Sequence, residues 1–291
     1  MLRALLFLTA SAAAAAARLV GLYHAPGDAS SCSLITVDPT TGANTTLSPT
    51  TVCDGLVSDF PAYAAADAAT NTLFVAVSGA ATAFAVDILT GASAPLAALA
   101  NDPADDLVGA AFIPGAGFLV VLQSGVYNAT APGAPASLIV ALDDWPAAVV
   151  ASAPGGGTGG AGRLFVANRA STAIRVVDLG APRAAPVALR GVAKPMDVAF
   201  DAERLYEVAS YRLSVISAKA GGGAPALVTP LPDGPGFPSA YGFVEPGVFF
   251  FQDFNNTFTV NIAKKAVTKL DAPFVGASRR VGQSFAFADA R

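Results

Sequence analysis

The residues best suited to chemistry in this chain are carboxylates and amides that border short apolar segments. Asn168, Asp197 and Asp253 each lie beside such a segment, and their side-chain oxygen atoms are the ligands that Ca²⁺ takes in proteins. Several carboxylates brought to one place repel one another unless they are protonated or hold a hard cation. Two interpretations follow: polar side chains of this kind could form a calcium site, or they could cap strands and face water separately, which is the interpretation that we favour from the residues alone.

A wider set of polar residues occupies equivalent positions beside the apolar segments. We expect this set to form a ligand-binding face, made of Asp59, Asp106, Asp144, Trp145, Arg169 and Arg212. Trp145 is the single tryptophan, and its ring could stack on a sugar or an apolar ligand or pack inside the protein.

Groups for nucleophilic or zinc chemistry are scarce. His24 is the one histidine and no G-x-S-x-G motif is present, so a Ser-His-Asp arrangement has little to build on. One histidine and two cysteines do not supply a zinc site. The sequence therefore predicts no catalytic residues and favours a protein that is not an enzyme.

The elements that position these residues are short strands in a degenerate repeat. In the stretch 194–218, apolar runs end at Phe200, Ala209 and Ile216 and are separated by polar turns, and a fourth run follows at 225–229. We name these runs the first, second, third and fourth strands of a repeat. Four such strands recurring every ~40 to 50 residues are typical of the blades of a β-propeller.

The second strand of each repeat carries an aromatic residue, and these aromatics are 41 to 51 residues apart. They are Tyr23, Phe74, Phe118, Phe165, Tyr206 and Phe250. The third strand recurs in the segments 33–42, 83–91, 137–143 and 174–180, and in three copies the strand ends in Val-Asp, where the carboxylate suits turn chemistry. We expect an all-β, six-bladed propeller, or seven blades if two repeats are merged between residues 101 and 151.

The first repeat lacks its own first strand, and an extra copy, VGQSFAFADAR, ends the chain. We expect this C-terminal strand to join the first blade and close the ring, which leaves no open sheet edge there. The loops that lead into each first strand and those that join the second to the third then lie on one face, around the central channel. Asn168, Asp197, Asp253 and the wider polar set all belong to these loops.

Residues 1–17 resemble a secretory signal peptide, with Arg3, an apolar core and an alanine run that ends at Ala17. We expect cleavage there, one propeller domain over 18–291, and a secreted, extracellular or cell-surface location, with organelle targeting as the alternative. No later apolar run is long enough to span a membrane. Glycosylation acceptor patterns begin at Asn44, Asn128 and Asn255.

Cys32 and Cys53, the two cysteines, flank a strand hairpin of the first repeat. We expect a disulfide bond that closes a loop of about 20 residues and contributes roughly 3 kcal/mol, with two free thiols as the alternative. Charged residues make up 13% of the chain and the formal net charge is −4. This charge disfavours nucleic acid as a partner, because phosphate backbones bind to basic surfaces.

The segments RLFVANRASTAIRVVDL and KPMDVAFDAERLYEVAS resemble the YVTN-type repeats of surface-layer propellers and, more loosely, NHL-type and gluconolactonase-like six-bladed propellers. Members of the gluconolactonase-like group hold a divalent metal through an early Glu and a later Asn and Asp. The resemblance implies that Asn168 matches the Asn and that Asp197 or Asp253 matches the Asp. The first Glu in this chain is Glu203, so the early ligand is missing.

Three functions remain open at this point. We expect a secreted, monomeric, non-catalytic scaffold that binds a protein or glycan partner across the loop face and has no certain cofactor. The first alternative is a calcium-dependent hydrolase or lactonase of the gluconolactonase-like type. The second is a structural protein of the cell surface or matrix.

Overall fold

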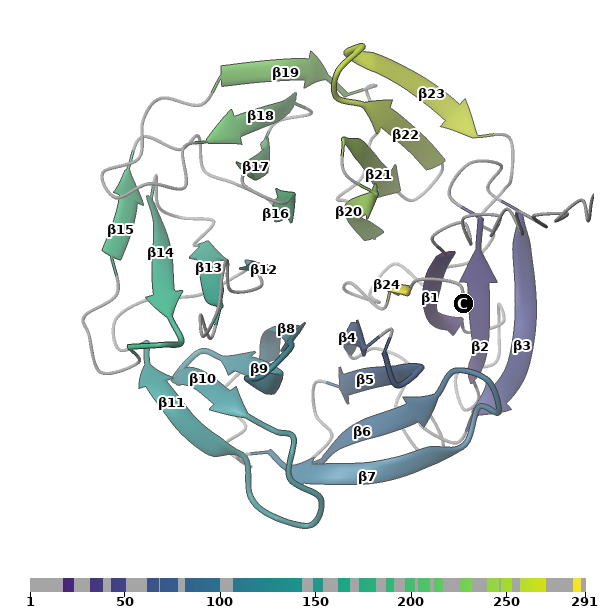
Figure 1. Ribbon diagram of the computed structural model, residues 1–291, viewed down its shortest axis with the longest axis vertical. Coiled ribbons are helices and arrows are strands. Elements are labelled where there is room, and N and C mark those ends of the chain that lie inside the picture. The colour runs from purple at the N-terminus through teal and green to yellow at the C-terminus, as the bar shows by residue number, and fades with distance from the viewer. Residues whose placement is uncertain are drawn as a thin grey trace, which may run out of the picture.

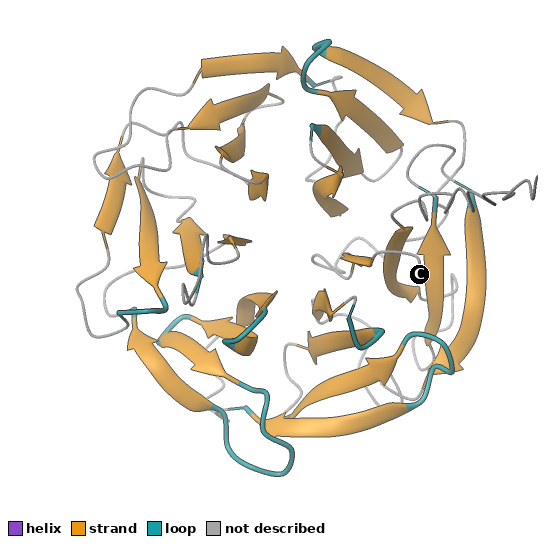
Figure 2. Cartoon of the chain, viewed as in Figure 1, coloured by secondary structure: helices purple, strands orange, loops and turns teal. Residues whose placement is uncertain are grey.

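The structure is a computed structural model, which describes the following parts of the chain: residues 18–23, 32–38, 43–50, 62–67, 69–77, 82–99, 107–142, 149–153, 162–167, 173–181, 187–190, 197–201, 204–209, 212–216, 226–231, 240–245, 247–252, 257–270 and 285–288. These residues form strands and turns with no helix (Figure 2). The short strands are bounded by the turn residues that the sequence repeats.

The described strands form six antiparallel sheets of four strands each. We number the sheets in chain order. The first sheet contains β24 (Phe285–Ala288), β1 (Arg18–Tyr23), β2 (Cys32–Val37) and β3 (Asn44–Thr50). The second contains β4 (Ala62–Asp67), β5 (Thr72–Val77), β6 (Thr82–Asp87) and β7 (Ser93–Ala98). The third contains β8 (Leu107–Ile113), β9 (Gly117–Leu122), β10 (Gly125–Asn128) and β11 (Ser137–Ala141).

The remaining sheets follow the same order of strands. The fourth contains β12 (Val149–Ala153), β13 (Arg163–Ala167), β14 (Ala173–Asp178) and β15 (Val187–Arg190). The fifth contains β16 (Asp197–Asp201), β17 (Arg204–Ala209), β18 (Arg212–Ile216) and β19 (Ala226–Pro230). The sixth contains β20 (Ala240–Glu245), β21 (Val248–Gln252), β22 (Thr257–Asn261) and β23 (Ala266–Leu270).

The sheets stand around a common centre (Figure 1). Their innermost strands are β24, β4, β8, β12, β16 and β20, and their outermost strands are β3, β7, β11, β15, β19 and β23. The innermost strand of the first sheet comes from the far end of the sequence, because β24 pairs with β1 from Arg18↔Ala288 to Gly21↔Phe285.

The aromatic residues that marked the repeat lie in β1, β5, β9, β13, β17 and β21, as the sequence predicted. One assignment was wrong. Residues 137–143 were expected to contain a third strand, but β11 is the fourth strand of its sheet and β10 is the third. β10 has only four residues, GVYN, and follows β9 after the two-residue turn Gln123-Ser124, so its apolar pattern is too short to recognise.

The core lies between neighbouring sheets. In β5, Leu73, Val75 and Val77 belong to a cluster shared with the first sheet, whereas Phe74 and Ala76 belong to a cluster shared with the third. Because side chains alternate between the two faces of a strand, a strand that is covered on both faces must be apolar at every position. This explains the continuous apolar runs TLFVAV and GFLVVL, in which the last five residues are buried.

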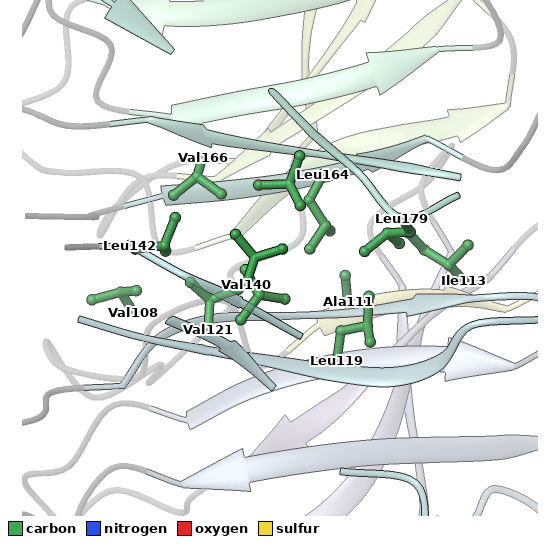
Figure 3. Packing of buried hydrophobic residues seen from close by; sticks show 12 residues of the cluster. Val108, Ala111, Ile113, Leu119, Val121, Val140, Leu142, Leu164, Val166 and Leu179 are labelled. Carbon is green, nitrogen blue, oxygen red and sulfur yellow. The ribbon is translucent and has the colours of Figure 1, made fainter. Parts of the chain in front are cut away.

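The same packing joins the third and fourth sheets (Figure 3). Val121 and Val140 of the third sheet pack in one cluster with Leu164 and Val166 of the fourth. Another cluster joins the fifth and sixth sheets through Tyr206 and Phe249. Apolar clusters thus join the first sheet to the second, the second to the third, the third to the fourth and the fifth to the sixth.

Candidate functional site

Each sheet has a loop end and a turn end, defined by strand direction. The loop end is where the first strand begins and the second strand ends. In the fifth sheet, Asp197 begins β16 and pairs with Val208, while Arg212 begins β18 and pairs with Ala209. The backbone register therefore places Asp197 and Arg212 at the same end of one sheet, as the sequence analysis expected.

The other two candidate calcium ligands follow strands at the loop ends of adjacent sheets. Ala167, the last residue of β13, pairs with Val149 at the start of β12, and Asn168 follows it. Gln252, the last residue of β21, pairs with Ala240 at the start of β20, and Asp253 follows it. Asn168 and Asp253 themselves lie outside the described residues.

The candidate ligand-face residues on the remaining loops also lie outside the described residues; they are Asp59, Asp106, Asp144, Trp145 and Arg169. Their neighbours in sequence do fix where each loop begins or ends. For example, Leu107 follows Asp106 and pairs with Leu122, so this loop meets the loop end of the third sheet.

One part of the loop end is described in full, and sequence reasoning had missed it. In the third sheet, Ser124 Oγ and Tyr127 Oη lie 2.7 Å apart, and the backbone N–H of Leu142 donates to the carbonyl of Ser124 at 2.9 Å. A Cβ atom on Gly125 would lie 2.7 Å from the carbonyl oxygen of Val140. The sequence Gln123-Ser124-Gly125 could have indicated this turn, because a turn whose backbone lies this close to a neighbouring strand requires glycine.

At the turn ends, carboxylates accept hydrogen bonds from the backbone N–H groups of residues two or three positions later in the chain. Asp87 Oδ1 accepts from the N–H groups of Leu89 and Thr90, each at 2.8 Å, and Asp178 Oδ1 accepts from Gly180 N–H at 2.9 Å. The Val-Asp pairs at these two positions therefore perform turn chemistry, which confirms the prediction.

The hydrogen bonds also shift the acidity of Asp87. The bond from the Thr90 backbone lowers the pKa of Asp87 below its usual value of 3.8; slight desolvation opposes this, and the Leu89 backbone bond adds to the lowering. Hydrogen bonds to a carboxylate favour its charged form. Asp87 is thus held ionised by the turn that it organises.

The candidate glycosylation sites differ in their surroundings. Asn128 ends β10 and is half-buried; its Nδ2 donates to the carbonyl of Ala116 at 2.9 Å, and its Oδ1 accepts from Thr130 N–H at 2.9 Å. Asn44 begins β3 opposite Val37, and Asn255 lies outside the described residues. Asn128 therefore already has a structural role.

The two cysteines lie in and beyond one hairpin. Cys32 begins β2 and pairs with Thr50, the last residue of β3. Cys53 follows Thr50 by three residues and lies outside the described residues.

Two further observations concern only the part of the chain that the structure describes. It contains no group of three or more His, Cys, Asp or Glu residues that could hold a metal ion. It also contains no helix that is both long enough and apolar enough to cross a membrane.

Solved structures provide the only informative comparison with known proteins, because no family model and no curated protein matches the sequence. A structure of a nidogen/laminin complex matches 94% of this chain and 98% of the other, with 10% identity and a TM-score of 0.67. Ycf48 bound to a D1 peptide matches 88% and 82%, with 8% identity and a TM-score of 0.56. A calcium-binding protein, regucalcin from Agrobacterium tumefaciens, matches 74% and 74%, with 14% identity and a TM-score of 0.54.

The fold is a β-propeller. The similar structures are propellers of the NHL and YVTN type, and regucalcin represents the gluconolactonase-like group, so the resemblance seen in the repeats is confirmed. At these identities the likeness concerns the fold of this propeller and leaves its activity open.

Proposed function

We propose that the protein is a secreted, non-catalytic, six-bladed propeller that binds a protein partner across the loop ends of its blades. In this proposal each four-stranded sheet is one blade, and β24 closes the ring by completing the first blade. The pairing of β24 with β1 and the six-sheet order support this arrangement.

The observation that carries the proposal is the likeness to propellers described together with other polypeptides. The nidogen/laminin structure matches this chain over nearly its full length, and Ycf48 was solved with a bound peptide. Loops are the segments of a propeller that vary most freely without disturbing its core. The loop ends of this chain carry both acids and bases, including Asp197 and Arg212, which suit a polar protein surface.

Secretion, a disulfide bond and glycosylation belong to the same proposal. β1 begins at Arg18, so cleavage after Ala17 would leave β1 and its pairing with β24 intact. Cys53 is three positions after Thr50 in the sequence, a span of at most about 11 Å, which allows Cys53 to return toward Cys32 opposite Thr50. We therefore retain the Cys32–Cys53 disulfide, the glycans at Asn44, Asn128 and Asn255, and a monomeric single-domain protein as parts of the proposal.

The test compares charge reversals at two ends of the molecule. Arg212→Glu alters a loop end, whereas Lys264→Glu alters an exposed residue of the turn between β22 and β23, at the turn end of the sixth sheet. Each purified variant, first checked by thermal melting, is immobilised and exposed to extracellular proteins of the source. We expect one extracellular protein that binds to the native chain and to Lys264→Glu but does not bind to Arg212→Glu. Identical retention by all three, or retention by none, would refute a protein-binding loop face, and binding on a glycan array would then identify a glycan partner.

The second candidate function is a calcium-dependent hydrolase or lactonase. The observation in its favour is that Asn168, Asp197 and Asp253 border the loop ends of three successive sheets, whose inner strands β12, β16 and β20 stand side by side (Figure 1). The likeness to regucalcin, a calcium-binding protein, is compatible with such a site.

Calcium binding separates the two candidates. A ligand that binds only the folded state at 100 times its Kd stabilises it by about 2.7 kcal/mol. A calcium site would therefore raise the melting temperature in millimolar calcium above that in EDTA, and Asp197→Asn would abolish the rise. A melting temperature that does not change with calcium would exclude a tight site and with it this candidate.

A further inference from the structure

The loop that joins β10 to β11 reaches across to the neighbouring sheet. We call residues 129–136 the strap. Gly133 N–H donates to the carbonyl of Leu96 at 2.7 Å, Ala98 N–H donates to the carbonyl of Ala134 at 3.0 Å, and Ala136 N–H donates to the carbonyl of Ala98 at 2.8 Å. The strap also forms a parallel bridge between Ala98 and Pro135. Three backbone bonds thus attach the third sheet to β7, the outermost strand of the second (Figure 1).

The base of the strap is fixed to its own sheet by side chains. Thr130 Oγ1 accepts from Phe118 N–H at 2.8 Å, Asn128 Nδ2 donates to the carbonyl of Ala116, and Ala129 N–H donates to the carbonyl of Phe118 at 2.9 Å. Ala129 is fully buried. Because its base is held in this way, the strap meets β7 in one position. Less conformational entropy is therefore lost when the tip of the strap pairs with β7.

The same two sheets are joined on the inside by stacked aromatic rings. Phe74 of β5 stacks on Phe112 of β8 and Phe118 of β9, with ring centroids 5.2 and 5.1 Å apart and interplanar angles of 16°. Aromatic pairs of this kind contribute beyond the area that they bury. The boundary between the second and third sheets is therefore held by aromatic packing inside and by backbone hydrogen bonds outside.

We propose that the strap makes the second and third sheets open and unfold as one cooperative unit. This proposal does not depend on the function proposed above. Backbone hydrogen bonds between two sheets couple their opening, because neither sheet can separate from the other without breaking those bonds. The edge of β7 is also covered by the strap, which removes part of an open pairing surface.

Native-state hydrogen exchange of the full chain in increasing urea tests the proposal. The segments 72–99 and 107–142 report on the two sheets. Ala98→Pro removes the N–H group of β7 that donates to Ala134, and Ala136→Pro removes the N–H group of the strap that donates to Ala98. Each variant therefore loses one hydrogen bond between the strap and β7. Ala98→Thr is the matched control, because Ala98 is exposed and threonine keeps the backbone N–H.

We expect the two segments of the native chain and of Ala98→Thr to lose protection together, with one urea dependence. In each proline variant we expect them to separate, and the Gly133 amide to exchange roughly twofold to tenfold faster, the factor that corresponds to one hydrogen bond. Separate opening of the two segments in the native chain would overturn the proposal. Opening that remains coincident in both proline variants would also overturn it, because the strap would then contribute nothing to the coupling.

Discussion

Gly117 is the position where a single methyl group should disturb the strap most. Its φ is +90°, and a Cβ atom built there would overlap Thr130 Oγ1 and lie 3.2 Å from Thr130 Cβ. Thr130 Oγ1 is the acceptor for Phe118 N–H. Gly117→Ala therefore imposes a strained backbone and also displaces the hydroxyl group on which that amide depends.

A neighbouring glycine separates the two effects. Gly115 has a φ of +86° with nothing within 4 Å of its built Cβ, so Gly115→Ala measures backbone strain alone, about 1–3 kcal/mol. Gly117→Ala adds the cost of an unsatisfied buried amide, about 1–3 kcal/mol. We therefore expect Gly117→Ala to lower the free energy of unfolding by about 1–3 kcal/mol more than Gly115→Ala does.

Urea denaturation of the two variants and of Thr130→Ala, alone and combined with Gly117→Ala, provides the assay. Thr130→Ala should be costly in the native chain but should add little to Gly117→Ala, because the hydroxyl group is already displaced. Such non-additivity, of order 1–2 kcal/mol, is what a double-mutant cycle detects between groups in contact. Equal destabilisation by Gly115→Ala and Gly117→Ala, or strict additivity with Thr130→Ala, would refute the reasoning.

Three further predictions concern a turn, a core and a candidate glycosylation site. Because its folded pKa is lowered, Asp87 stabilises the protein above the usual carboxyl pKa and ceases to do so as the pH falls through the folded pKa; Asp87→Asn should thus lower the melting temperature at pH 7 by an amount that shrinks as the pH falls below the usual carboxyl pKa, and an effect that does not change with pH would contradict this. Phe74→Ala should cost about 3–5 kcal/mol in urea denaturation, because it empties the aromatic stack, whereas Phe74→Leu should cost clearly less. Asn128→Asp should cost about 1–3 kcal/mol, because a carboxylate does not donate to the Ala116 carbonyl; unchanged stability in the same assay would show that this bond is dispensable.

The sequence predicted the repeated strands well because they obey strong constraints. Phe118 and Phe165 lie in second strands with at least four successive buried residues, and both side chains are fully buried. Such strands must be apolar throughout, so the aromatic residue and its apolar neighbours are visible in one sequence. The Val-Asp turns were equally readable, because the bonds at Asp87 and Asp178 span only two or three residues.

The features that the sequence did not reveal depend on contacts between distant residues. The glycosylation pattern at Asn128 is local in sequence, whereas the side-chain amide of Asn128 donates to the carbonyl of Ala116, twelve residues away. The strap was not anticipated, because backbone bonds to β7 leave no side-chain pattern. The candidate calcium and ligand-face residues follow from strand order alone, which predicts the end of the sheet that they occupy and not the distances between them.

The pairing of β24 with β1 has a consequence for synthesis on the ribosome. β1 is made first among the described strands and β24 last, so the inner edge of β1 has no partner until residues 285–288 have left the exit tunnel. Until β24 has been synthesised, the first sheet consists of β1, β2 and β3. An unpaired strand edge invites association with other nascent chains. The inner edge of β1 therefore stays open to such association until β24 has been synthesised and has paired with it.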